Sequence, residues 1–127
     1  MSKIVLDASA LLAFLNEEPG AERWASAMGG AAISTVNLAE VVGRLADAGV
    51  PEVDIRDALE PLGMEVVDFT PAMAYRAGVL RPVTRDTGLS LGDRACLALA
   101  QELGVPVLTA DRAWEGLRVP VKVRVMR

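Results

Sequence analysis

Two short, mostly apolar runs, each closely followed by an aspartate, constrain the fold of this chain most strongly. Ile4 to Leu6 leads directly into Asp7, and the run from Val105 to Thr109 is followed after one alanine by Asp111. Runs of this length and composition are typical of strands that are buried on both faces of a parallel sheet. Ligands bind at the carboxyl ends of the strands in such sheets. We therefore expect both aspartates at that edge.

A predicted helix before the second run carries a third acid, Asp93. Its buried face has the i, i+3, i+4, i+7 spacing and consists of Cys96, Leu99, Ala100 and Leu103. Asp93 lies near the start of this stripe, and Gly104 is placed to end the helix. Ser90 and Asp93 also have the spacing of a capping box, so helix stability alone is an alternative explanation for this acid.

Helix and strand signals alternate along the rest of the chain. Ser9 is predicted to cap a helix through Leu15, and Thr35 to cap a helix that carries Glu40. Thr70 and Pro71 have the pattern of a helix start. The other predicted strands comprise residues 31–33, 64–69 and a half-buried edge strand at 119–125, while residues 81–88 are predicted to form a polar loop. Five strands interleaved with helices predict an α/β sandwich on a parallel sheet.

Composition excludes several kinds of chemistry. The 127 residues, 52% of them hydrophobic, predict a single domain over residues 1–127. There is no histidine and one cysteine, which excludes imidazole catalysis, an internal disulfide and a cysteine metal clip. Active chemistry must then use carboxylates, hydroxyls, basic side chains or a metal held by oxygen. This favours Mg²⁺ or Mn²⁺ over Zn²⁺.

Charge and hydropathy limit the binding partners and the cellular location that we expect. The net charge of −4 argues against a general polyanion binder. The chain contains no apolar run near the roughly 20 residues that span a bilayer, and its start lacks a signal peptide's pattern. We therefore expect a cytoplasmic protein without a membrane segment.

Four acids are expected to share one cleft: Asp7 and Asp111 after strands, and Glu40 and Asp93 near helix starts. For Glu40 the alternative is an exposed ion pair with Arg44, four residues on. Clustered carboxylates without a counterion destabilise a fold, so the cluster implies a bound cation, and Mg²⁺ fits best. Such a cation activates water for attack on phosphorus. Without histidine to activate a 2′-hydroxyl, we expect cleavage that leaves a 5′-phosphate. Ser9 and Thr109 are placed to hydrogen-bond the carboxylates or a metal-bound water.

The chain resembles, over essentially its whole length, the PIN-domain ribonucleases, and specifically the VapC toxins of type II toxin-antitoxin systems. The resemblance is carried by the segments Val5–Ser9, Thr35–Glu40, Leu91–Asp93 and Leu108–Asp111, together with Trp114. It implies a three-layer α/β sandwich, with helices on both faces of a five-stranded parallel sheet in the order 3-2-1-4-5. It also implies that Asp7, Glu40, Asp93 and Asp111 are the catalytic and Mg²⁺- or Mn²⁺-binding acids. The implied partners are RNA, a second copy of the chain, and a cognate VapB-type antitoxin whose C-terminal segment covers the cleft.

Other functions are weighed against this one. A haloacid-dehalogenase-type phosphatase needs a second acid two residues after the first, where this chain has Ser9. A phosphoacceptor receiver domain needs an aspartate after its third strand, whereas Asp68 falls within the predicted strand. A PIN-like nuclease that is not a toxin, or a non-catalytic metal-binding domain that interacts with RNA, remains an alternative.

Two surface expectations complete the sequence reading. Arg81 and Arg85, in the predicted loop just before Asp93, are candidates to seat the RNA backbone. Trp24 and Met28, on a short helix after Pro19, are expected at a partner interface, with ordinary core packing as the alternative. The RNA target, the cleavage site and the number of metal ions are left open by the sequence.

Overall fold

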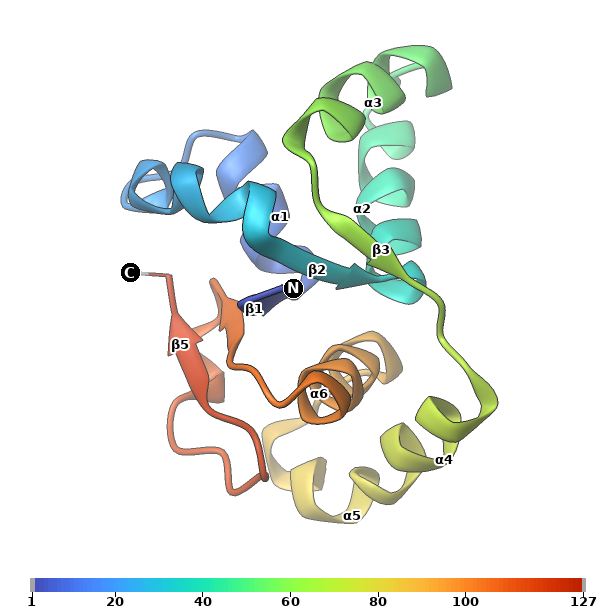
Figure 1. The fold of residues 1–127 in the computed structure, drawn as a ribbon, viewed down its shortest axis with the longest axis vertical. Helices are drawn as coiled ribbons and strands as arrows, with labels where there is room; N and C mark the ends of the chain where they lie inside the picture. The colour runs from blue at the N-terminus through green and yellow to red at the C-terminus, as the bar shows by residue number, and fades with distance from the viewer. Residues whose placement is uncertain (1, 127) are drawn as a thin grey trace.

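All five strands pair in parallel in one sheet of the computed structural model, which describes residues 2–126 (Figure 1). The strands are β1 (Ile4–Leu6), β2 (Ala31–Ser34), β3 (Glu65–Val67), β4 (Val107–Thr109) and β5 (Val123–Val125), in the order β3-β2-β1-β4-β5. Val5 at the centre is in register with Ala32 on one side and Val107 on the other. The α/β class, the parallel sheet and the strand order implied by the resemblance are confirmed.

Helices and short 3-10 turns connect the strands. The helices are α1 (Ala8–Leu15), α2 (Thr35–Asp47), α3 (Glu52–Leu59), α4 (Pro71–Val79), α5 (Arg81–Thr84) and α6 (Leu91–Leu103). The turns are η1 (Ala21–Gly30), η2 (Glu60–Leu62), η3 (Arg85–Thr87) and η4 (Arg112–Trp114). Gly104 ends α6 with a φ of 67°, in the left-handed region that glycine adopts without strain, as its predicted role requires.

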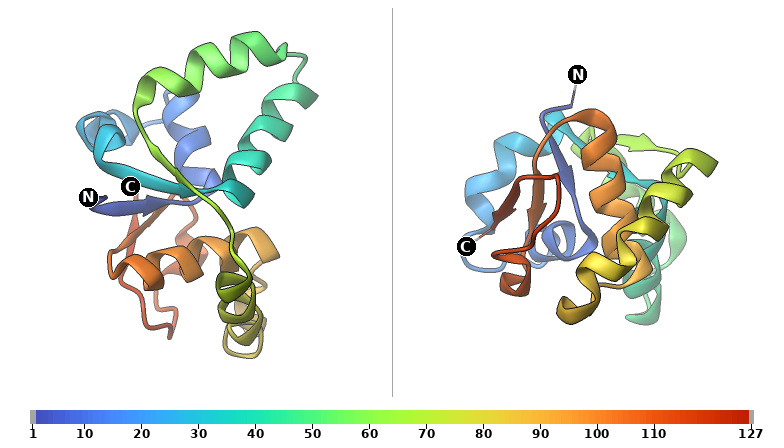
Figure 2. Two further views of the ribbon diagram at one scale, coloured as in Figure 1. Left: turned by 45° about the vertical axis from the view of Figure 1, so that its right-hand side comes forward. Right: turned by 90° about the horizontal axis from the view of Figure 1, so that it is seen from below.

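Alternating side chains of β1 belong to cores on opposite faces of the sheet. Val5 packs in a cluster with residues of α4 and α6, while Ile4 and Leu6 pack with residues of α1 and η1. A third cluster joins α1, α2 and α3 over β2. Two views show α1 and α3 on one side of the sheet and α4 and α6 on the other (Figures 1 and 2). The sandwich therefore has three layers, as expected.

Two predicted caps are wrong by one or two residues. Asp7, not Ser9, caps α1, because its Oδ1 accepts a hydrogen bond from the backbone N–H of Ala10 at 2.8 Å. Ser34, not Thr35, caps α2, and Thr35 instead accepts a hydrogen bond from the N–H of Phe69. In both cases at most one residue separates the strand from the helix. The residue directly before the helix has an extended backbone, so its side chain is in position to cap the helix.

The segment 81–88 is not the predicted loop but two short helical turns, α5 and η3. Pro82 lies in the first turn of α5, where its missing N–H is not needed. Thr84 is buried and donates its hydroxyl proton to the carbonyl of Leu80 at 2.8 Å. The predicted polar loop therefore begins with a helix start that contains a proline.

The segment with Trp24 and Met28 packs within the chain. Met28 is buried in the core beside α1, and the indole N–H of Trp24 donates to the carbonyl of Met126. Core packing is therefore the better interpretation, and a partner interface through Met28 is wrong. Between residues 2 and 126, the helices are all too short or too polar to span a bilayer.

Candidate active site

The four predicted acids come together at the carboxyl edge of the sheet. Asp7, Glu40, Asp93 and Asp111 all line one cavity of about 500 Å³, which we call the acid cavity. Asp7 follows β1, Glu40 lies on α2, Asp93 is in the first turn of α6, and Asp111 follows β4. Segments up to a hundred residues apart thus deliver their carboxylates to one place, as the strand and helix positions predicted.

Asp7 is the buried member of the cluster and accepts three kinds of hydrogen bond. Thr109 donates to its Oδ2 at 2.6 Å, Ser9 donates to its Oδ1 at 2.8 Å, and the N–H of Ala10 completes the set. Thr109 in turn accepts from the N–H of Asp111 at 3.0 Å. Ser9 and Thr109 therefore occupy the supporting positions that the sequence predicted for them.

Glu40 is held by two residues that sequence reasoning missed. The side-chain amide of Asn37 donates to Glu40 Oε1 at 2.8 Å and to the carbonyl of Gly92 at 2.9 Å. A side-chain carbon at Gly92 would clash with the Glu40 carboxylate. Asn37 is fully buried, so it ties α2 to the first turn of α6. The predicted alternative for Glu40, an ion pair with Arg44, is absent among residues 2–126.

Asp93 and Asp111 both serve as helix caps in this structure. Asp93 Oδ2 accepts from the N–H of Ser90 at 2.9 Å, while Ser90 Oγ accepts from the N–H of Asp93, which completes the capping box. Asp111 Oδ1 accepts from the N–H of Ala113 at 2.9 Å. The capping role of Asp93 is thus real, and it coexists with a position on the acid cavity.

Burial and mutual repulsion perturb the ionisation of this cluster. The pKa of Asp7 rises from 3.8 to about 6, chiefly because burial penalises its charged form, with a smaller contribution from the negative charge of Asp93. Burial also raises the pKa of the Cys96 thiol, and the charges of Asp7, Asp93 and Glu40 raise it further. The negative charges of three acids therefore all raise the pKa of one buried thiol on α6, as expected when the three lie close together.

The donor set fits an oxygen-binding cation in chemistry, although not in its present arrangement. The cavity offers carboxylates and hydroxyls without histidine, which is the set that Mg²⁺ or Mn²⁺ prefers. A cation would also offset the cost of ionising buried Asp7. Within the described residues, however, no three acids stand close enough to hold a metal ion.

The acid cavity has further lining residues that the sequence did not assign to the cleft. Arg44 and Asp47, on α2 beyond Glu40, line it together with Leu12 of α1. Their one sequence signal is the spacing from Glu40 along the same helix, which places Arg44 one turn away. Arg81 and Arg85 are exposed on α5 and η3 and are not among the lining residues.

A family model and several solved structures match this chain. The PIN-domain family model matches residues 4–119. A chain of a toxin-antitoxin complex from Klebsiella pneumoniae is 21% identical over 98% of both chains, with a TM-score of 0.76. A chain of the DNA-bound VapBC complex from Salmonella typhimurium is 20% identical over the full length of both, with a TM-score of 0.77. A chain of FitAcB from Neisseria gonorrhoeae is 20% identical over 97% of both chains, with a TM-score of 0.68. No curated protein sequence matches the chain.

Proposed function

The chain belongs to the PIN-domain family, and on that basis we propose that it is a metal-dependent endoribonuclease that acts as the toxin of a toxin-antitoxin pair. The observation that carries the proposal is the convergence of Asp7, Glu40, Asp93 and Asp111 on one cavity at the carboxyl edge of the sheet. Three of these acids also accept hydrogen bonds at helix starts, but that role does not require four segments to bring their carboxylates to one cavity. A site that neutralises them with a divalent cation and then takes a phosphodiester explains their position.

In this proposal Asp7, Asp93, Asp111 and Glu40 hold Mg²⁺ or Mn²⁺, which supplies activation of water and charge neutralisation at the phosphate. Ser9 and Thr109 orient the Asp7 carboxylate through the hydrogen bonds described above. Asn37 and Gly92 fix Glu40 against α6. Asp93 and Asp111 each accept a hydrogen bond at a helix start on one carboxylate oxygen, which leaves the other oxygen of each for the cation. The acids would have to move closer together to bind it.

The partners are also proposals. The similar structures include a toxin-antitoxin complex, VapBC and FitAcB, which supports an antitoxin of the VapB type as the regulator of this chain. We propose that a segment of that antitoxin covers the acid cavity and excludes RNA. A homodimer, as implied by the family resemblance, completes the proposed assembly.

Sequencing the 5′ ends of cellular RNA tests the proposal. The wild-type chain and an Asp7→Asn variant are expressed in parallel, and cleavage by the purified proteins is followed with Mg²⁺ and with a chelator. We expect new 5′-phosphate ends only from the wild type with Mg²⁺. Identical fragment profiles from both proteins would remove the nuclease function and favour a non-catalytic binding domain.

A further inference from the structure

The acid cavity opens into a second, larger one. This outer cavity has a volume of about 720 Å³ and shares five lining residues with the acid cavity: Ser9, Leu12, Arg44, Asp47 and Asp111. From there it continues along the ends of α1 and α2 to Asn16 and Ala48. The two cavities therefore form one groove that leads away from the four acids.

Arg44 lies where the two cavities join. Among the residues that the structure describes, it is the one basic residue that lines either cavity. Its side chain is exposed and makes neither a hydrogen bond nor an ion pair within residues 2–126, although acids surround it. It follows Glu40 by one helical turn, so their Cβ atoms are about 5–6 Å apart on the same helix face.

We propose that Arg44 binds an RNA phosphate next to the one that is cleaved, and so directs the strand from the acid cavity into the outer cavity. The inference rests on the proposed function, because the acids define where cleavage occurs. A single-stranded RNA entering this groove meets the negative field of six lining acids: Asp7, Glu18, Glu40, Asp47, Asp93 and Asp111. An unpaired guanidinium at the junction offers the planar donor pair that recognises phosphate.

Arg44 joins Arg81 and Arg85 as a candidate for the RNA path, and the contact of those two with the RNA backbone stays a prediction. Both lie outside the residues that line the two cavities. Arg44, by contrast, shares its helix with Glu40 and its cavity with all four acids. A phosphate held by Arg44 therefore fixes the strand relative to the cleavage site.

Equilibrium binding of a labelled single-stranded RNA across a salt series tests this role. Arg44→Gln and Arg44→Lys are made in an Asp93→Asn parent, which prevents cleavage during the titration. Arg44→Gln should weaken binding about tenfold, as expected for loss of one charge-assisted contact. It should also reduce the slope of log affinity against log salt by about 0.7, the value for one phosphate contact on a single strand. Arg44→Lys should keep the slope, since it keeps the charge.

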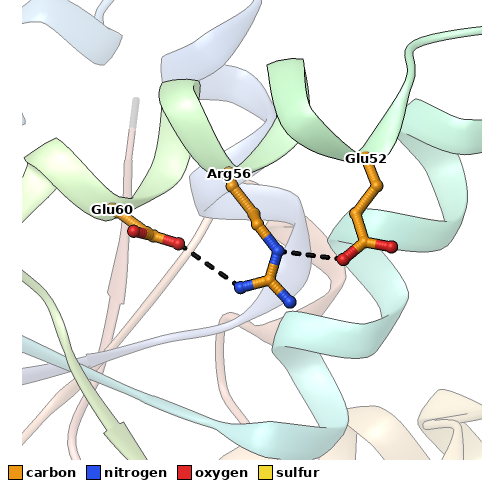
Figure 3. Close-up of polar contacts among 3 residues, drawn as sticks. All are labelled: Glu52, Arg56 and Glu60. Atoms are coloured by element: carbon orange, nitrogen blue, oxygen red, sulfur yellow. Dashed lines mark hydrogen bonds and ion pairs between the residues drawn. The ribbon is translucent and has the colours of Figure 1, made fainter.

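Arg56→Gln in the same parent is the matched control. Arg56 is an exposed arginine on α3 that pairs with Glu52 at 2.9 Å and with Glu60 at 3.4 Å (Figure 3). Its replacement changes the net charge of the chain by the same amount but lies outside both cavities. RNA affinity and salt slope should equal those of the parent.

Two results would overturn the assignment. One is an Arg44→Gln protein whose RNA binding has the same salt slope as the parent. If this protein also needs less Mg²⁺ for half-maximal thermal stabilisation, Arg44 only balances the charge of the acids. The other is an Asp93→Asn parent that does not bind RNA although the wild type cleaves it. The acids, and not Arg44, would then hold the substrate. A wild-type chain that neither binds nor cleaves RNA would instead refute the proposed function itself.

Discussion

The carboxylate of Glu40 lies against Gly92, in the space that any side chain at position 92 would occupy. Gly92→Ala should therefore displace Glu40 and break its hydrogen bond from Asn37. We expect cleavage to fall about 10- to 100-fold, the range for loss of a residue that supports a metal site. Initial rates of RNA cleavage and urea denaturation, measured on the same preparation, check this.

Gly78→Ala is the control for that variant. Gly78 is also helical, on α4, but a side-chain carbon there meets nothing within 4 Å. The substitution should stabilise the chain by up to about 1 kcal/mol through helix propensity and leave cleavage unchanged. Equal cleavage by the two alanine variants would show that the position of Glu40 against α6 is unimportant.

Asp7 makes stability depend on pH when no metal is present. The pKa of Asp7 is about 6 in the folded chain, against an ordinary value of 3.8, so the folded state binds this proton more tightly than the unfolded state. The free energy of unfolding should then fall as pH rises from about 4 to about 6, by on the order of 3 kcal/mol from this group. In Asp7→Asn this fall should be absent. Urea denaturation at several pH values measures it.

The control for this pH dependence is Asp57→Asn, on the exposed side of α3. This variant should keep the wild-type fall between pH 4 and 6. If Asp7→Asn and Asp57→Asn follow the same curve, Asp7 is not the group responsible. Above pH 6 the full penalty of ionised Asp7 is present, and Mg²⁺ should offset part of it.

Thr109→Val should move this pH window upward. The Thr109 hydroxyl donates to Asp7 at 2.6 Å and lowers the pKa of that carboxyl. Without this hydrogen bond, burial should raise the pKa of Asp7 further. Stabilisation by Mg²⁺ should then begin at a higher pH than in the wild type, because the cation needs the ionised form. Thr109→Ser keeps the hydroxyl and should behave as the wild type does. An unmoved onset in Thr109→Val would mean that Asp7 does not control cation binding.

Local patterns predicted most of the elements and the convergence of the acids. The apolar run before Asp7, and the stripe on α6 with Gly104 at its end, predicted a strand and a helix that the structure confirms. Parallel strands present their carboxyl ends at one edge, and so these patterns also predicted that the acids converge. The exact cap was wrong where a helix follows a strand without a loop, as at Asp7, because the backbone angles there depend on the sheet.

Residues whose roles depend on long-range packing could not be predicted. Asn37 has no periodic signal, and its task of joining Glu40 to Gly92 exists only because α2 and α6 pack together. Arg44 was considered only as an ion-pair partner for Glu40, since its place between two cavities depends on α1 and on the segment after β4. Pro82 predicted a loop because a proline at a helix start and one in a loop look alike locally.

Asp93→Asn tests the central claim most directly, because the amide oxygen of asparagine can still accept the hydrogen bond from the N–H of Ser90 while the side chain carries no charge. Melting is measured with and without Mg²⁺, alongside RNA cleavage. Without Mg²⁺ the variant should be more stable than the wild type, since repulsion of Asp7 is relieved. At 100 times its dissociation constant Mg²⁺ should stabilise the wild type by about 2.7 kcal/mol, and the variant should lose most of this together with cleavage. A variant that responds to Mg²⁺ and cleaves RNA as the wild type does would contradict the account.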